Sequence, residues 1–311
     1  MKTSTLKLTV QPLWTSYMQC FKAISDYLKL GHSTAEIFGA TGHAFILNIH
    51  PELCPSSVTC FFAEPLDERA RNLGFSVHTT IFAQSFEDFD QQQKKTWEAA
   101  KTFLDKGKPL IGWDLQIPEY YIINGYDKEN YLFYDLKGQP QKVKWNKLGK
   151  GETTIANIKR IEKEDTVADL NKTLKDAFSL ALDFARGKKE WVFPGYFSGK
   201  KAFAVWIEAL QSGKGNHFGA VYNAQVWAEC KSYGNLFLRE SKKKLKSKLL
   251  DKLIEHYDVL TWSLQKVADI YKPDKEKYTS EEIETAVDAL FLAQEADKAA
   301  LAEMKLLLSQ L

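Results

Sequence analysis

The fold of this chain is decided by one stretch, Gly107-Lys-Pro-Leu-Ile-Gly-Trp-Asp-Leu-Gln-Ile-Pro-Glu-Tyr-Tyr-Ile-Ile-Asn-Gly-Tyr-Asp127, and by Tyr131-Leu-Phe-Tyr-Asp135 shortly after it. Branched and aromatic residues dominate both segments, which is typical of β-strands. Turns are predicted at Pro118 and over residues 126–130, where proline, aspartate and asparagine favour chain reversal. The stretch therefore predicts three consecutive short strands.

The bulk composition restricts the class of protein. The 311 residues are long enough for two domains, and 42 basic residues nearly balance 40 acidic ones. This balance argues against nucleic acid as a partner, because a nucleic-acid site needs clustered positive charge. No signal peptide and no window of about 20 apolar residues is evident. We therefore expect a cytoplasmic protein with no membrane partner and with an oligomeric state that the sequence leaves open.

The sequence lacks several common motifs for metal binding, cofactor binding and catalysis. Four cysteines are present without a CxxC pair, so neither a zinc site nor a disulfide framework is expected. The chain contains no Walker loop, no HExxH, no GxSxG and no dinucleotide fingerprint. We expect no metal and no cofactor.

The pattern along the chain changes near residue 162. Before it, helical and strand patterns alternate; after it, helical periodicity dominates. We expect an α+β domain over 1–162 and an all-helical domain over 163–311. The predicted helices are 16–30, 85–106, 165–186, 200–212, 218–240, 243–271 and 280–310, and the further predicted strands are 43–49, 75–82, 141–145 and 153–161.

The three strands resemble the second half of a papain-like cysteine hydrolase core, a central helix on an antiparallel sheet. In that superfamily the second strand opens with the catalytic histidine, and the third ends at an aspartate or asparagine that orients it. Here Glu119 occupies the first position and Asp135 the second. The nucleophilic cysteine of the superfamily sits at the start of the central helix, and Cys20 lies near the start of the first predicted helix.

The whole chain resembles bacterial proteins related to the butirosin biosynthesis protein H family. The resemblance is carried by residues 41–50 with 53–56, by 112–119 and by 222–229. It implies a papain-like N-terminal domain followed by a helical C-terminal domain. The namesake of the family is an acyltransferase that moves an aminoacyl chain from a carrier-protein thioester to an aminoglycoside amine.

Several residues depart from the catalytic pattern. A carboxylate at Glu119 would raise the pKa of a nearby thiol, whereas an imidazolium would lower it. Trp14 stands where the superfamily has the glutamine of the oxyanion hole, about six residues before the cysteine. Cys20 also shares a helical stripe with Ile24 and Leu28, which is typical of a core cysteine.

Two functions remain open at this point. The first is a binding protein with a degenerate triad, which holds a small amine- or acyl-bearing metabolite in a cleft between its domains. The second is a cysteine-dependent acyltransferase or amidohydrolase, in which Cys20 accepts an acyl group from an acyl-carrier or amide substrate and a second residue manages protons. The candidate catalytic residues are Cys20, His43, Glu119 and Asp135, and the candidate ligand contacts are Trp113, Asp114, Tyr121, Tyr222 and Asn223.

Each candidate also has a structural interpretation. His43 and Glu119 could be strand-end residues, and Asp135 could shape a turn. Asn223 could satisfy a buried backbone group between two aromatic residues. A third interpretation treats the helical half as an interaction platform for assembly.

Overall fold

The computed structural model describes residues 4–188, 190–246 and 248–311. The fold is a mixed α+β fold with an antiparallel sheet and a helical C-terminal region. The chain divides into two compact units, each built from two separate segments. Unit 1 consists of Met1–Ser33 and Gly74–Thr166, and unit 2 consists of Thr34–Leu73 and Val167–Leu311.

Unit 1 contains an antiparallel sheet with the strand order β3-β8-β4-β5-β6-β7, and β1 pairs with the end of β5 that β4 leaves open. The predicted strands of the decisive stretch are confirmed as β4, β5 and β6. The strands are β1 (Ser4–Thr5), β3 (Phe75–Ala83), β4 (Leu110–Trp113), β5 (Tyr120–Tyr126), β6 (Asn130–Tyr134), β7 (Pro140–Lys144) and β8 (Ile155–Lys163).

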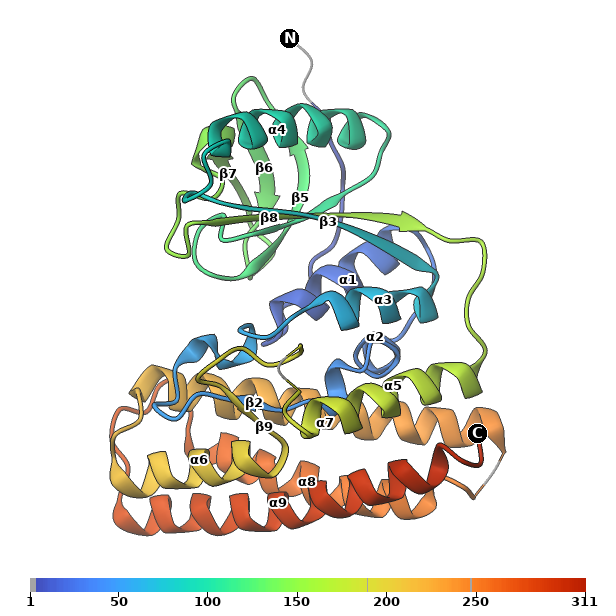
Figure 1. Ribbon diagram of the computed structural model, residues 1–311, viewed down its shortest axis with the longest axis vertical. Helices are drawn as coiled ribbons and strands as arrows, with labels where there is room; N and C mark the ends of the chain where they lie inside the picture. The colour runs from blue at the N-terminus through green and yellow to red at the C-terminus, as the bar shows by residue number, and fades with distance from the viewer. Residues whose placement is uncertain (1–3, 189, 247) are drawn as a thin grey trace. The chain divides into compact units, whose positions relative to one another are not determined.

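Two helices cover the two faces of this sheet, α1 (Ser16–Tyr27) and α4 (Phe89–Asp105) (Figure 1). Successive residues of a strand point to opposite faces, so Tyr120 stacks on Tyr17 of α1 while Tyr121 belongs to the core under α4. The short helix η4 (Trp145–Lys147) follows β7. The sheet thus places the entrance of β5 next to the start of α1.

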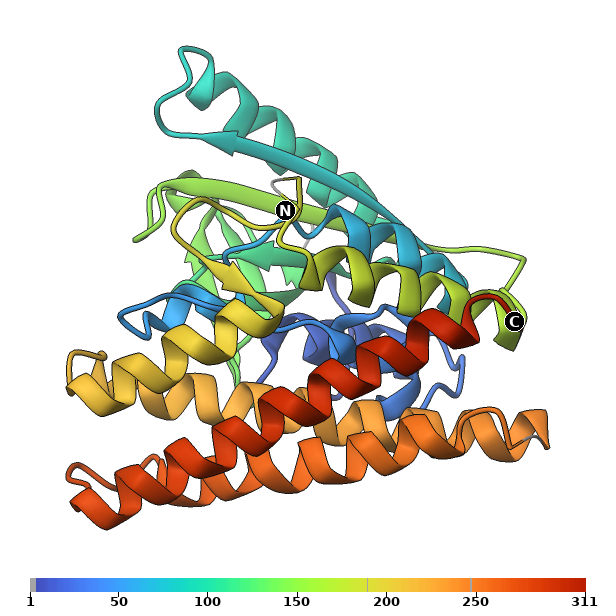
Figure 2. The ribbon, with the colours of Figure 1, turned by 60° about the horizontal axis from the view of Figure 1, so that its bottom comes forward.

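Unit 2 is mainly helical. Its helices are α2 (Thr34–Ala40), η1 (His43–Phe45), η2 (Pro55–Val58), α3 (Glu64–Arg69), η3 (Ala70–Leu73), α5 (Leu170–Ala185), α6 (Gly199–Ser212), α7 (His217–Leu245), α8 (Asp251–Ile270) and α9 (Ser280–Leu307). The long helices α7, α8 and α9 pack as neighbours (Figure 2). Helix α9 begins with a capping box between Thr279 and Glu282, which satisfies two backbone donors of its first turn.

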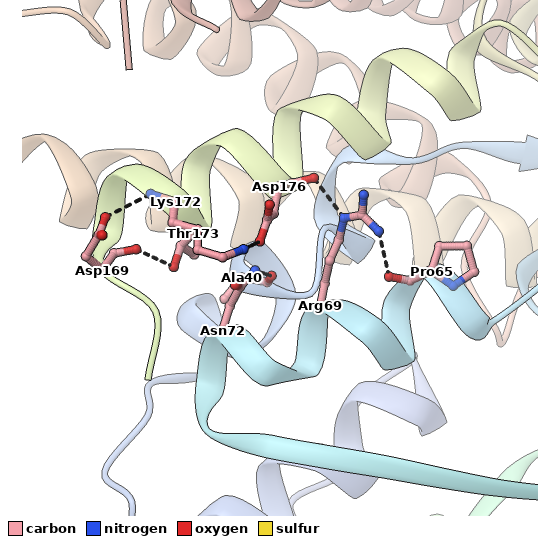
Figure 3. Close-up of polar contacts among 8 residues, drawn as sticks. All are labelled: Ala40, Pro65, Arg69, Asn72, Asp169, Lys172, Thr173 and Asp176. Atoms are coloured by element: carbon pink, nitrogen blue, oxygen red, sulfur yellow. Dashed lines mark hydrogen bonds and ion pairs between the residues drawn. The ribbon is translucent and has the colours of Figure 1, made fainter. Parts of the chain in front are cut away.

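Hydrogen bonds hold the segment 34–73 to the C-terminal helices. The Arg69 guanidinium donates to the backbone oxygen of Asp176 in α5 at 2.8 Å and, within its own segment, to that of Pro65 at 2.9 Å (Figure 3). The buried Lys231 ammonium of α7 donates to the backbone oxygens of Ala44 at 3.1 Å and Ile46 at 2.9 Å. These contacts explain why the observed units differ from the consecutive domains predicted over 1–162 and 163–311.

The structure also corrects local predictions. The strand predicted over 43–49 is limited to β2 (Asn48–Ile49), because His43–Phe45 form the turn η1. The region predicted to be all helical contains β9 (Phe197–Ser198), which pairs with β2. The helix predicted over 243–271 begins later, at Asp251, and residue 247 lies outside the described residues. No helix in the described part of the chain is long and apolar enough to cross a membrane.

Candidate functional site

The start of α1 meets the entrance of β5 at a hydrogen-bonded pair, Ser16 and Glu119. Ser16 is the first residue of α1, and its hydroxyl donates to a carboxylate oxygen of Glu119. The same hydroxyl accepts the backbone N–H of Tyr120 at 3.1 Å. Both side chains are buried. A buried serine and a buried carboxylate therefore face each other where the start of α1 meets the entrance of β5.

Local geometry explains how this pair forms. The backbone N–H of Asp114 donates to the backbone oxygen of Glu119 at 2.9 Å, which closes the turn between β4 and β5. Asp114 adopts a left-handed backbone conformation with φ of 56°, which aspartate tolerates better than most residues. The turn fixes Glu119 just before β5, so its side chain reaches the first turn of α1.

Two tyrosine rings and a buried lysine lie on the same face of the sheet as α1. Tyr17 stacks on Tyr120 with a centroid separation of 4.5 Å. The Lys159 ammonium, on β8, lies 5.3 Å from the centre of the Tyr17 ring and donates to the Thr79 hydroxyl at 3.1 Å. Lys159 is only 1% exposed, which is unusual for a lysine. This face of unit 1 therefore combines a buried carboxylate, a buried ammonium and two tyrosine rings.

Cys20 lies one helical turn beyond Ser16 and is 1% exposed. Burial raises the pKa of the Cys20 thiol well above its usual value, and the negative charge of Glu119 raises it further. Both effects favour the neutral thiol, which is a poor nucleophile. The surroundings of Cys20 are those of a core cysteine, and the residue at the helix start is Ser16.

The ligand contacts proposed around β4 and β5 have other partners. The Asp114 carboxylate accepts from the backbone N–H of Thr153 at 2.9 Å and from its hydroxyl at 2.8 Å. The Trp113 indole N–H donates to the same hydroxyl at 3.0 Å. Tyr121 is buried in the core under α4, and its hydroxyl contacts the backbone of Ile117. Asp114 is thus bound to the loop before β8, and Tyr121 lies on the sheet face opposite Ser16.

Asp135 shapes the turn after β6. One carboxylate oxygen accepts the backbone N–H groups of Lys137 at 2.9 Å and Gln139 at 2.8 Å. The backbone of Asp135 closes the same turn through Gly138 and Gln139. These contacts are those of an aspartate that forms a turn, which is the structural role considered for Asp135 from the sequence.

The remaining candidates belong to unit 2, so they are built into a different unit from Cys20 and Glu119. His43 is buried, and its Nδ1 lies 3.4 Å from the sulfur of Cys230. The Asn223 amide donates to the backbone oxygen of Gly219 at 2.8 Å and accepts from the Trp227 indole at 3.2 Å. Tyr222 is half-buried and stacks on Phe218. Asn223 thus satisfies a buried backbone oxygen, which is the structural role considered for it from the sequence.

Sequence reasoning missed Ser16 and Lys159. In the sequence, Ser16 is an ordinary residue at the start of a helix. Its contact with Glu119, which lies far away in the chain, becomes visible only in the folded structure. Lys159 had a usable signal, because Lys159 and Arg160 are adjacent in a strand and must point to opposite faces of the sheet. One of the two therefore had to face the α1 side.

Comparisons with known proteins do not extend this picture. No protein-family model matches the chain, and no curated protein is significantly similar to it. Among the described residues, no group of three or more His, Cys, Asp or Glu side chains is arranged to hold a metal ion.

Proposed function

We propose that unit 1 is a papain-like core in which Ser16 and Glu119 replace the cysteine and histidine, and that this site binds a small amine-bearing metabolite without turning it over. The observation that carries the proposal is the Ser16 to Glu119 hydrogen bond at the start of α1. A papain-like core requires a central helix against an antiparallel sheet, and α1 packs on β5 in this way.

The chemistry of the pair favours binding. The Ser16 hydroxyl faces a carboxylate and not the imidazole that acts as general base in serine hydrolases, so the pair favours binding over activation of the hydroxyl. The Glu119 carboxylate accepts the Ser16 hydroxyl, and carboxylate oxygens are the acceptors that an ammonium group prefers in proteins. An ammonium group of a ligand would gain a charge-assisted hydrogen bond there.

The alternative function, acyl transfer through Cys20, has less support. The thiol is buried, and both influences on its pKa oppose the thiolate. A histidine partner is required to offset them, and His43 is instead in contact with Cys230. We therefore place Glu119, and not Cys20, at the centre of the proposed function.

Calorimetric titration of the full chain with a panel of small amines tests the proposal. The panel should include amino sugars, diamines and amino acid esters, with the matching neutral alcohols as charge controls. We expect one amine class to bind and its alcohol analogue to fail. Glu119→Gln should weaken binding at least tenfold, equivalent to about 1.4 kcal/mol.

Cys20→Ala is the matched control, since it removes the thiol while leaving the carboxylate in place. Its affinity for the amine should equal that of the unaltered protein. An amine whose affinity survives Glu119→Gln but is lost in Cys20→Ala would refute the proposal and return attention to thiol chemistry.

A further inference from the structure

A pocket of about 290 Å³ lies on the other side of the sheet, between α4 and strands β3, β8 and β4. All of its lining residues belong to unit 1. Its floor is apolar and consists of the buried side chains of Ala100, Leu110 and Ile158. Its volume is at the lower end of the range for ligand pockets, about 300–1,000 Å³, so only a small molecule fits.

The sequence of α4 explains why space remains here. The helix fills the core elsewhere with Trp97 and Phe103, but toward the pocket it presents the small side chains of Ala99 and Ala100. Arg160 lies two residues beyond Ile158 on β8 and therefore on the same face of the sheet. This arrangement puts a cation at the mouth of an apolar pocket.

The charge at the pocket is positive. Lys95 and Arg160 both line it, and no lining residue is acidic. The nearest acid along β8 is Glu162, whose charge interacts with that of Arg160. The Glu162 carboxylate accepts a hydrogen bond from Lys108 at 3.1 Å and does not line the pocket. The neutral polar residues Thr80, Gln92 and Thr96 complete the lining.

We propose that this pocket binds a small organic carboxylate, with its carboxylate held by Arg160 and Lys95 and its apolar body on Ala100, Leu110 and Ile158. Arginine is suited to this role because its planar guanidinium pairs with both oxygens of a carboxylate. The apolar floor favours an acid with a short aliphatic chain or a single ring over a bare anion. The site is separate from the Ser16 and Glu119 pair, which lies on the opposite face.

Titrations followed by two-dimensional amide NMR of the full chain test the proposal, with hexanoate and benzoate as probes. We expect saturable shifts at residues of α4 and β8 for at least one acid. Arg160→Gln should weaken its binding about tenfold. Ala99→Leu should abolish it, because Ala99 is exposed at the mouth and a larger side chain there fills the pocket without disturbing the core.

Three controls make the test decisive. Lys94→Gln removes a neighbouring exposed lysine that does not line the pocket, and it should leave the affinity unchanged. Hexylamine should not bind there, because its charge has the wrong sign. Inorganic phosphate should bind more weakly than the organic acids. Failure of both acids to saturate, equal affinity in Ala99→Leu, or tighter binding of phosphate would overturn the proposal.

Discussion

Lys231→Met is the substitution from which we expect the largest loss of stability. Lys231 is fully buried in α7, and its ammonium donates to two backbone oxygens of the segment that precedes β2. Burial lowers the pKa of the Lys231 ammonium, and the carboxylate of Asp297 offsets part of that effect. Burial likewise raises the pKa of Asp297, and Lys231 acts against that shift. The lysine is therefore both a hydrogen-bond donor and a counter-charge.

The magnitude follows from these roles. Methionine preserves most of the apolar stem but leaves the carbonyls of Ala44 and Ile46 without their donor, at about 1–3 kcal/mol each. It also removes the positive charge that acts on the buried carboxyl group of Asp297, at a further cost in free energy. Because a protonated Asp297 avoids part of this cost, we expect a total of about 3–5 kcal/mol. This is a large fraction of the about 5–15 kcal/mol that stabilises a typical domain.

Urea denaturation of the full chain, followed by circular dichroism and tryptophan fluorescence, measures the effect. Lys243→Met is the matched control, because Lys243 lies exposed in the same helix. The control should change stability by no more than about 0.5 kcal/mol. A loss below about 1 kcal/mol for Lys231→Met would show that the buried network contributes little to holding the segment 34–73 in unit 2.

Three further outcomes are expected. Burial and the Lys231 charge lower the pKa of His43 to about 3, so between about pH 6.5 and 3 the unfolded chain binds a proton that the folded unit does not. The free energy of unfolding should therefore fall with decreasing pH, by about 2 kcal/mol at pH 5. Urea titrations of His43→Gln should lack this dependence on pH. If the variant and the unaltered protein showed the same dependence, the burial of a neutral imidazole would be contradicted. Gly219→Ala should lower the melting temperature in a thermal scan, because its Cβ would meet the backbone oxygen of Leu53, whereas the same change in an open helix stabilises by about 1 kcal/mol. Thr279→Ala should cost about 1 kcal/mol in the same scan by removing the capping box of α9, and an unchanged melting temperature would mean that this helix end is frayed.

The sequence was most informative where side-chain patterns are local. The strands around Pro118 and the helices from residue 170 onward were recognisable, because alternation and helical periodicity reflect burial of one face. The stretch 43–49 was misread as a strand because all of it is buried, so no alternation of buried and exposed residues separates a strand from a turn. The placement of 34–73 in unit 2 depends on contacts with residues such as Asp176 and Lys231, far away in the chain, which no local pattern encodes.

The candidate site was located only in part. Glu119 was identified from its position at the entrance of the second strand, and the structure adds Ser16 as its hydrogen-bond partner. Cys20 attracted attention because cysteine is the expected nucleophile, but one helical turn separates it from the helix start and takes it into the core. A shift of four residues keeps a side chain on the same helical stripe, which is why the sequence alone did not separate the two positions.

The reactivity of Cys20 tests the central claim most directly, namely that the site around Glu119 binds a ligand and performs no thiol chemistry. The native protein should be treated with iodoacetamide across a range of pH, and labelling of each cysteine should be followed by peptide mass spectrometry. The half-buried Cys54 and Cys60 serve as internal controls. We predict that both controls are labelled while Cys20 stays unlabelled until the protein unfolds. Rapid labelling of Cys20 with a midpoint below about pH 7.5, against about 8.5 for an ordinary thiol, would contradict the account.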